Sequence, residues 1–271
     1  MSMDKMELAK EAVRAAEAAG ADYADARLVR LNLEELSVKN GAPGDAEAPE
    51  EWGVGVRVRK EGCFGFGARP LVQGSEAAVV REAALAAVEC AGALGGAMRA
   101  PTGWAELSPE EESYYETPVG KDPFAVSVSE RLELLQAANA SMDGHDAVVS
   151  RQAHCSLRRE EQWQASSEGA LLHQLLIRTG AGMDVTAALN GQVQRRSHPS
   201  SWGNYKSGGW EHVEAMDLTS QGARIRESAV ALCSADPCPS GERTVVIGAS
   251  QLALQIHGSV EHPNGMDRVH G

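Results

Sequence analysis

The sequence predicts an α+β fold in which antiparallel sheets are flanked by helices, arranged in two related units. Alanine- and leucine-rich segments carry apolar residues at helical spacing, and the segments between them are rich in alternating β-forming residues. The order helix, strands, helix occurs twice along the 271 residues. Sequence identity between the two halves is low, so the repeat is one of element order. This length suits one large domain or two ordinary ones.

Clear stop and turn signals support the elements of the first half. In chain order, we expect a helix over 4–19, a strand over 23–41, a hairpin over 53–68 and a helix over 75–94. Gly20 ends the first helix, Asn40-Gly41 predicts a turn, and Glu61-Gly62 predicts the turn of the hairpin. A phosphate-binding loop is the alternative for the glycines of this hairpin. It is disfavoured because such a loop needs a helix N-terminus directly after it.

The second half repeats the order with longer strands. We expect a helix over 127–142, several strand-like runs within 147–197, a Gly/Ser/aromatic loop over 197–212, a helix over 213–232, and a strand and helix over 241–257. Residues 97–122 are polar and contain three prolines, which predicts a linker. The loop contains three aromatic residues, Trp202, Tyr205 and Trp210. They could hold a substrate, but packing of the loop on the sheet is the favoured interpretation.

The composition excludes several classes of function. The net charge of −13 would repel phosphate groups, which argues against general nucleic-acid binding and against anionic membrane surfaces. No apolar run approaches the roughly 20 residues of a membrane span, and the first 20 residues lack the apolar core of a signal peptide. The odd number of cysteines, five, without framework spacing favours free thiols and a cytoplasmic location.

Two histidines near the end of the sequence are the clearest candidates for chemistry. In a regular helix His257 and His262 would differ by about 140°, because each residue turns 100°. Joint metal binding therefore needs a distorted turn or a helix that ends at the second histidine. Pro263 favours such an end, because the residue before a proline is pushed out of helical geometry. Metal ligands and ordinary surface histidines both remain open on spacing alone.

Stretches spread from residue 23 to the last residue carry a family resemblance. They are YADARLVRLNLEELSVKNG, GVGVRVRKEGCFGFGA, DPFAV, LRREEQWQASSEGALLHQLLIRTGAG, VQRRS, GGWEHVEAMDL, CPSGERTVVI and SQLALQIHGSVEHPNGMDRVHG. In this order they resemble the N-terminal and central parts of the TldD/PmbA family of zinc metallopeptidases. The resemblance implies an N-terminal domain over 1–98, a linker over 99–122, a central domain over 123–235 and the truncated start of a C-terminal metallopeptidase domain over 236–271.

The resemblance also assigns roles within the last stretch, where the family carries a His-Glu-x-x-x-His motif. It implies that His257 and His262 bind zinc and that the glutamate takes a proton from the water that zinc activates. Gly258 stands at the glutamate position, and loss of a general base typically costs about 10²–10⁴ in rate. Glu261 is a weak substitute, because it leaves a helix about 300° round from position 258. Gly265 stands where the family often has an acidic residue.

The resemblance therefore predicts a TldD-type metallopeptidase chain that is impaired and inactive alone. Family members continue into a C-terminal domain that supplies a further zinc ligand, and two histidines are fewer than a zinc site needs. The implied partners are a peptide substrate and either a second copy or a paralogous subunit, in a homodimer or heterodimer. The alternatives are a non-catalytic partner subunit or an inactive fragment. A role in DNA topology is disfavoured by the −13 charge.

Overall fold

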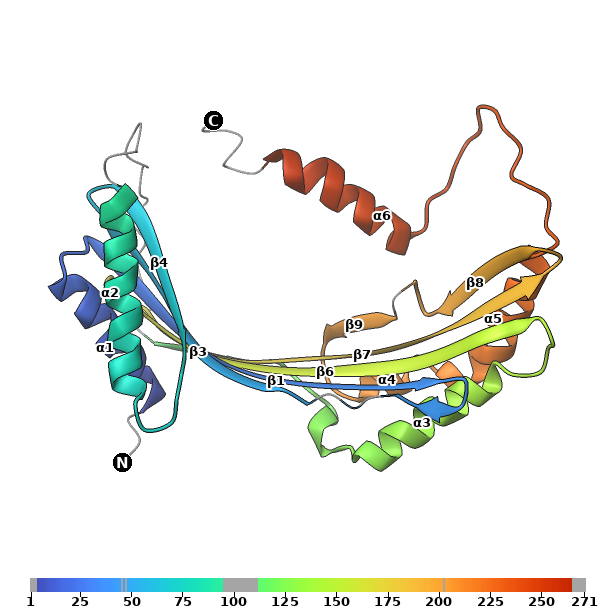
Figure 1. The fold of residues 1–271 in the computed structure, drawn as a ribbon, viewed down its shortest axis with the longest axis horizontal. Helices are drawn as coiled ribbons and strands as arrows, with labels where there is room; N and C mark the ends of the chain where they lie inside the picture. The colour runs from blue at the N-terminus through green and yellow to red at the C-terminus, as the bar shows by residue number, and fades with distance from the viewer. Residues whose placement is uncertain (1–3, 45, 47, 95–111, 202, 265–271) are drawn as a thin grey trace.

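One twisted sheet runs through the molecule. The protein is described by a computed structural model that covers residues 4–44, 46, 48–94, 112–201 and 203–264. The sheet has nine strands, and its main path is β4-β3-β1-β6-β7-β5, with β2 beside β1 and with β8 and β9 beside β7 (Figure 1). All described pairs are antiparallel except β5, which is parallel to β7. The predicted α+β class is confirmed.

The strand and helix bounds follow the turn signals of the sequence. The strands are β1 (Tyr23–Lys39), β2 (Ala42–Pro43), β3 (Glu50–Lys60), β4 (Cys63–Pro70), β5 (Ser113–Glu116), β6 (Val148–Ser166), β7 (Leu171–Leu189), β8 (Gln192–His198) and β9 (Asn204–Ser207). The α-helices are α1 (Lys5–Ala18), α2 (Glu76–Leu94), α3 (Val128–Ser141), α4 (Glu211–Glu214), α5 (Leu218–Leu232) and α6 (Ala249–Ile256), with 3-10 turns η1 (Pro123–Ala125) and η3 (His262–Asn264) and the π-helical turn η2 (His257–Glu261). Asn40-Gly41 and Glu61-Gly62 form their turns with positive φ at both residues.

The second half differs from the predicted elements in four places. The strand-like runs within 147–197 merge into two strands of nineteen residues, β6 and β7, and β8. The helix predicted over 213–232 is broken at Asp217, whose φ of 46° ends α4 and precedes α5. β5 lies inside the predicted linker, because it finds a backbone partner along the edge of β7. The strand predicted over 241–248 does not form in the described structure, where this segment has no pairing partner.

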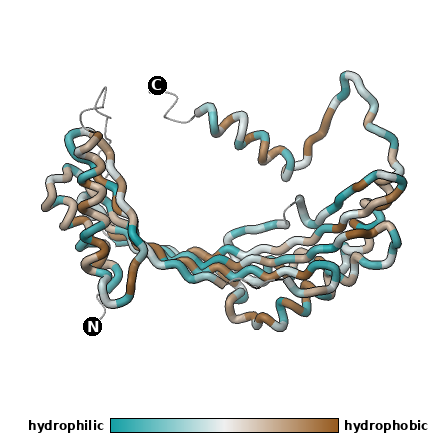
Figure 2. The backbone as a smooth tube through the Cα atoms, viewed as in Figure 1, coloured by the Kyte–Doolittle hydropathy of each residue, from teal (hydrophilic) through white to brown (hydrophobic). Residues whose placement is uncertain are grey.

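The direction of alternate side chains along β1 explains why the helices of both halves of the chain pack on one face of the sheet. Leu28 belongs to one hydrophobic core, and Leu36 and Val38 to a second, further along the same strand. These residues are separated by even numbers of positions, so their side chains leave the same face. Figure 2 shows the resulting alternation of apolar and polar residues along the strands. We call the opposite, largely uncovered face the concave face.

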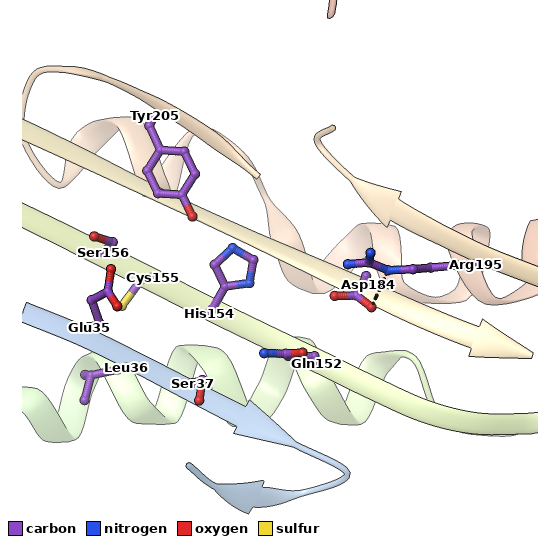
Figure 3. Close-up of a pocket in the computed structure, with 10 residues that line it drawn as sticks. All are labelled: Glu35, Leu36, Ser37, Gln152, His154, Cys155, Ser156, Asp184, Arg195 and Tyr205. Atoms are coloured by element: carbon purple, nitrogen blue, oxygen red, sulfur yellow. Dashed lines mark hydrogen bonds and ion pairs between the residues drawn. The ribbon is translucent and has the colours of Figure 1, made fainter. Parts of the chain in front are cut away.

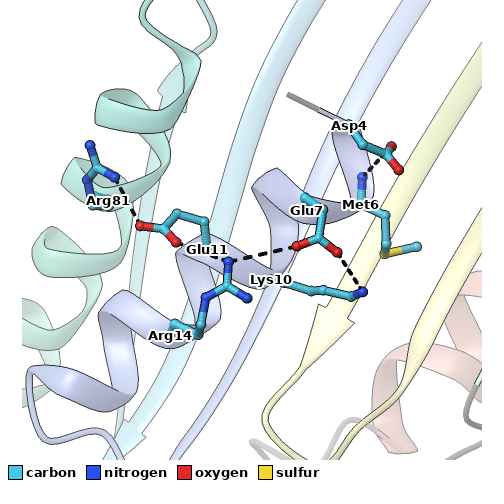
Figure 4. Close-up of polar contacts among 7 residues, drawn as sticks. All are labelled: Asp4, Met6, Glu7, Lys10, Glu11, Arg14 and Arg81. Atoms are coloured by element: carbon cyan, nitrogen blue, oxygen red, sulfur yellow. Dashed lines mark hydrogen bonds and ion pairs between the residues drawn. The ribbon is translucent and has the colours of Figure 1, made fainter. Parts of the chain in front are cut away.

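The first core lies between α1, α2 and the strands β1, β3, β4 and β6. The helix α1 is capped by Asp4, whose side chain accepts a hydrogen bond from the Met6 backbone N–H at 3.3 Å (Figure 4). On the outer side, Glu11 of α1 pairs with Arg81 of α2 at 3.0 Å. The hydrogen bond from Arg81 is the largest cause of the lowered pKa of Glu11, followed by the one from Arg14.

The second core lies between α3, α4 and α5 and the strands β1, β6 and β7. A capping box fixes the start of α3: the Glu130 backbone N–H donates to the Ser127 hydroxyl, and the Glu130 carboxylate accepts from the Ser127 backbone. Trp210 is 4% exposed in this core, which agrees with the packing interpretation for that aromatic residue. Trp202, by contrast, lies outside the described residues.

The helix α6 lies apart from both cores. It is on the concave side of the sheet, opposite to α3 and α5 (Figure 1). None of its residues is buried. Val246 before the helix, Leu254 within it and Val260 after it are 95%, 68% and 54% exposed. The apolar side chains around α6 are therefore uncovered among the described residues. No helix of the described residues is long and apolar enough to cross a membrane.

Candidate metal centre

The two motif histidines are brought together by a local change of helix type. Beyond α6 the chain forms the π-helical turn over His257–Glu261, and the His262 N–H donates to the His257 carbonyl. An i to i+5 bond makes one turn span five residues, whereas an α-helix would separate the two side chains by about 140°. The ring centroids of His257 and His262 are consequently 4.5 Å apart, with an angle of 66° between the ring planes. This is the kind of distorted turn that joint metal binding requires.

The pair would supply two of the ligands that a zinc site needs. A tetrahedral zinc ion takes imidazole nitrogens at about 2.0–2.1 Å and needs at least three protein ligands. The two imidazoles are close enough to share one ion. Across the described residues, however, there is no group of three or more His, Cys, Asp or Glu side chains that could hold a metal. The residues present therefore fit two of the ligand positions and do not complete the site.

Position 258 is open. A Cβ added at Gly258 would meet nothing within 4 Å, and its φ lies outside the positive range that favours glycine. Neither packing nor backbone conformation requires a glycine there, so a glutamate side chain could be accommodated. The side chain of Glu261, the weak substitute base, lies outside the described residues, as does Gly265.

Other histidines have local partners that explain them without a metal. His145 Nδ1 lies 3.0 Å from the Ala147 N–H, His173 Nε2 lies 3.0 Å from Glu161, and His198 Nε2 lies 3.0 Å from the Met216 carbonyl. His212 is half-buried, and burial is the largest cause of its lowered pKa. His154 differs from these, since it faces a pocket on the concave face that sequence reasoning missed. No local pattern in the sequence signals that pocket, because its side chains come from the five strands β1, β6, β7, β8 and β9.

The structure is thus an α+β protein in which two histidines meet just beyond the unpacked helix α6. The sequence matches the "PmbA/TldA metallopeptidase domain 1" over residues 24–93 and the "PmbA/TldA metallopeptidase central domain" over residues 121–232. The chain therefore belongs to the TldD/PmbA family of metallopeptidase-like proteins, as the resemblance implied. It is 27% identical over 252 residues to a metalloprotease of Methanothermobacter thermautotrophicus, covering 92% of this chain and 51% of that protein.

Solved structures share the fold. A candidate modulator of DNA gyrase from Thermotoga maritima superposes with a TM-score of 0.65 at 16% identity, over 87% of this chain and 50% of that one. TldE from Thermococcus kodakarensis gives 0.56 at 16% identity, over 84% of this chain and 47% of that one. At these identities the likeness shows the fold alone. The chain spans about half the length of the curated relative and of these structures.

Proposed function

We propose that this chain is a TldD-type metallopeptidase chain whose hydrolytic step is impaired. The observation that carries the proposal is the π-helical turn, which places His257 and His262 4.5 Å apart while the position between them that should hold a base is Gly258. In the proposed site, His257 and His262 bind zinc, and the remaining ligands come from residues beyond those described here. When bound, zinc supplies an activated water and polarises the peptide carbonyl.

The missing step is the proton transfer. Glycine has no side chain that accepts a proton. The histidines can therefore hold the metal ion, but position 258 cannot remove the proton of the attacking water. We expect the substrate to be a small or unfolded peptide, and the assembly to be a homodimer or a heterodimer with a paralogous subunit. The five free cysteines support a cytoplasmic location.

A non-catalytic partner subunit is the second candidate. It is favoured by the glycine at position 258 together with the uncovered apolar surface of α6, where Leu252, Leu254 and Ile256 are 39%, 68% and 51% exposed. A surface of this kind marks a place where another chain or domain packs. The zinc measurement below separates the two candidates.

The first experiment measures zinc in the purified chain. We expect near-stoichiometric zinc in the unmodified chain, loss in a His257→Ala, His262→Ala double variant, and retention in the control His145→Ala. Since no residue of α6 is buried, the double variant should keep its thermal stability. Equal zinc in the unmodified chain and the double variant would overturn metal binding and leave the partner subunit.

The second experiment restores the base. We expect Gly258→Glu to raise the hydrolysis of an unfolded peptide by about 10²-fold or more, the range for a general base. Gly258→Gln is the matched control, because it has nearly the same shape but cannot accept the proton. Equal activity of the two variants would show that the missing base is not the defect.

A further inference from the structure

The concave face carries a pocket that the metal motif does not use. Its cavity is about 470 Å³, and the side chains that face it come from β1, β6, β7, β8 and β9 (Figure 3). One row crosses four strands, because Glu35 pairs with Ser156, Ser156 with Gly180, and Gly180 with Tyr205. In the next row, Ser37 pairs with His154, which pairs with Gly182.

Two glycines of β7, Gly180 and Gly182, leave room for the rings that line the pocket. A Cβ at Gly180 would lie 2.1 Å from Cδ1 of Tyr205, and a Cβ at Gly182 would lie 3.1 Å from Cε1 of His154. Without those side chains, the rings of Tyr205 and His154 lie over β7 at an angle of 20°, with centroids 6.5 Å apart. Figure 3 shows the two rings side by side, so that they present a continuous aromatic surface to the pocket.

The charges of the pocket favour a cationic ligand. Asp184 is neutralised by Arg195, whose Nε lies 2.8 Å from its carboxylate. Glu35 is exposed and has no ion pair or hydrogen bond among the described residues. Its charge is nevertheless felt across the pocket, because it adds to burial in raising the pKa of Tyr205.

The neighbouring arginines do not supply a partner for Glu35. Arg158, one row away, donates from Nε and Nη2 to Glu160 at 3.1 and 2.7 Å. Arg178 lies 3.8 Å from the same carboxylate, and Gln162 also donates to it. Both guanidinium groups are thus directed away from the pocket, and Glu35 remains an unpaired carboxylate beside an aromatic surface.

We propose that this pocket binds the cationic side chain of a peptide, an arginine or a lysine, through the Glu35 carboxylate and the ring faces of Tyr205 and His154. A guanidinium group stacks on aromatic faces and pairs with a carboxylate at the same time. An acidic ligand would meet Glu35, and an aliphatic one would leave that carboxylate without a partner. The proposal rests on the proposed function, because it assigns a preference to the peptide substrate.

The experiment compares binding of two fluorescent peptides that differ only by arginine and citrulline, its neutral isostere. The full chain is titrated with each peptide by fluorescence anisotropy, without a requirement for zinc or hydrolysis. We expect the arginine peptide to bind about tenfold more tightly, in the range of one charge-assisted contact, and a lysine peptide to follow it. Glu35→Gln should remove this difference, and Tyr205→Leu should reduce it. The control Glu51→Gln, on the same concave face outside the pocket, should preserve it.

The outcomes distinguish the two proposals. Equal binding of the arginine and citrulline peptides by the unmodified chain would overturn the pocket assignment and leave a peptide-binding chain. A preference that survives in Glu35→Gln would also overturn it, because the cation would then bind elsewhere. Absence of binding for every peptide would overturn the peptide-binding function and the pocket assignment with it. The melting temperature of each variant is measured as well, and equal values show that a change in binding does not come from unfolding.

Discussion

At the scale of single residues, buried polar side chains fix where the second group of helices meets the sheet. Asn139 of α3 is completely buried, and its amide nitrogen donates to the carbonyls of Val38 and Arg151 at 3.1 and 3.0 Å. Its oxygen accepts from the Gly41 N–H at 2.9 Å. One side chain therefore binds three backbone groups at the adjoining ends of β1 and β6 and holds α3 against them.

Glu211 has a comparable role at the surface. Its two carboxylate oxygens accept from the backbone N–H groups of Gly209 and Lys121, each at 2.9 Å. Desolvation acts to raise the pKa of this carboxyl, but the hydrogen bonds from the backbone N–H groups outweigh it and lower the pKa to about 2. The ionised side chain therefore ties the start of α4 to the segment that leads into η1.

This lowered pKa predicts a pH-dependent contribution to stability. A carboxyl whose folded pKa lies below its unfolded value stabilises the fold above the unfolded value, about 4.3, and loses that effect as the pH falls toward 2. We expect Glu211→Gln to melt below the unmodified protein at pH 7, and the difference to shrink below about pH 4.3. Calorimetry from pH 7 to 3 measures it, with Glu89→Gln, an exposed glutamate of α2, as the control. A constant difference over this range would contradict the role of the ionised form.

At the scale of elements, close packing of α2 on β4 depends on two glycines. A Cβ at Gly65 would lie 2.1 Å from the Ala87 carbonyl oxygen, and a Cβ at Gly67 would lie 2.3 Å from the Ala83 carbonyl oxygen. The helix presents alanines to this strand, with Ala83, Ala87 and Ala91 fully buried. Small residues on both elements allow backbone-to-backbone contact, so there is no room for one extra methyl group.

We therefore expect Gly67→Ala to lower the free energy of unfolding by about 1–3 kcal/mol through overpacking. Urea denaturation measures this as a lower midpoint. Gly92→Ala is a matched control on α2 itself, because a Cβ there meets nothing within 4 Å. It should be neutral or slightly stabilising, since alanine favours a helix by about 0.5–1 kcal/mol over glycine. An unchanged midpoint for Gly67→Ala would show that α2 can shift without cost.

At the scale of the whole molecule, the two cores share strands. β1 pairs with β6 from Asp25↔Ser166 to Lys39↔Gln152, and both strands pass from the first core to the second. Trp163 of β6 packs in the first core and Leu157 of the same strand in the second. The division into an N-terminal and a central domain stays a prediction, since their strands form one continuous ladder.

This continuity predicts one cooperative unfolding transition. Leu28→Ala in the first core and Leu135→Ala in the second should each lower the stability by about 2–5 kcal/mol. Because β1 and β6 belong to both cores, each substitution should lower the midpoint of both regions. Hydrogen exchange of peptides from α1 and α5 across a urea series measures the two regions separately. Two distinct transitions, each sensitive to only one substitution, would contradict this prediction.

The sequence by itself determined the α+β class, the helices α1, α2 and α3, and the turns at Asn40-Gly41 and Glu61-Gly62. These depend on local physics, namely the periodicity of apolar residues, helix capping and the positive φ that glycine allows. The identity of the motif residues His257, Gly258 and His262 is also a property of the sequence. The two histidine rings come together only because the chain forms a π-helical turn there. The spacing of the histidines in the sequence does not by itself predict the i to i+5 hydrogen bond of that turn.

Only the tertiary structure decided that two sets of strands form one sheet, that β5 pairs along β7, and that Asp217 breaks a predicted helix. Strand pairing joins residues more than a hundred positions apart, and its register depends on neighbours that periodicity does not reveal. For the same reason the pocket was invisible in the sequence. Glu35, His154 and Tyr205 lie far apart along the chain, and cross-strand register on one face of the sheet is what brings them together.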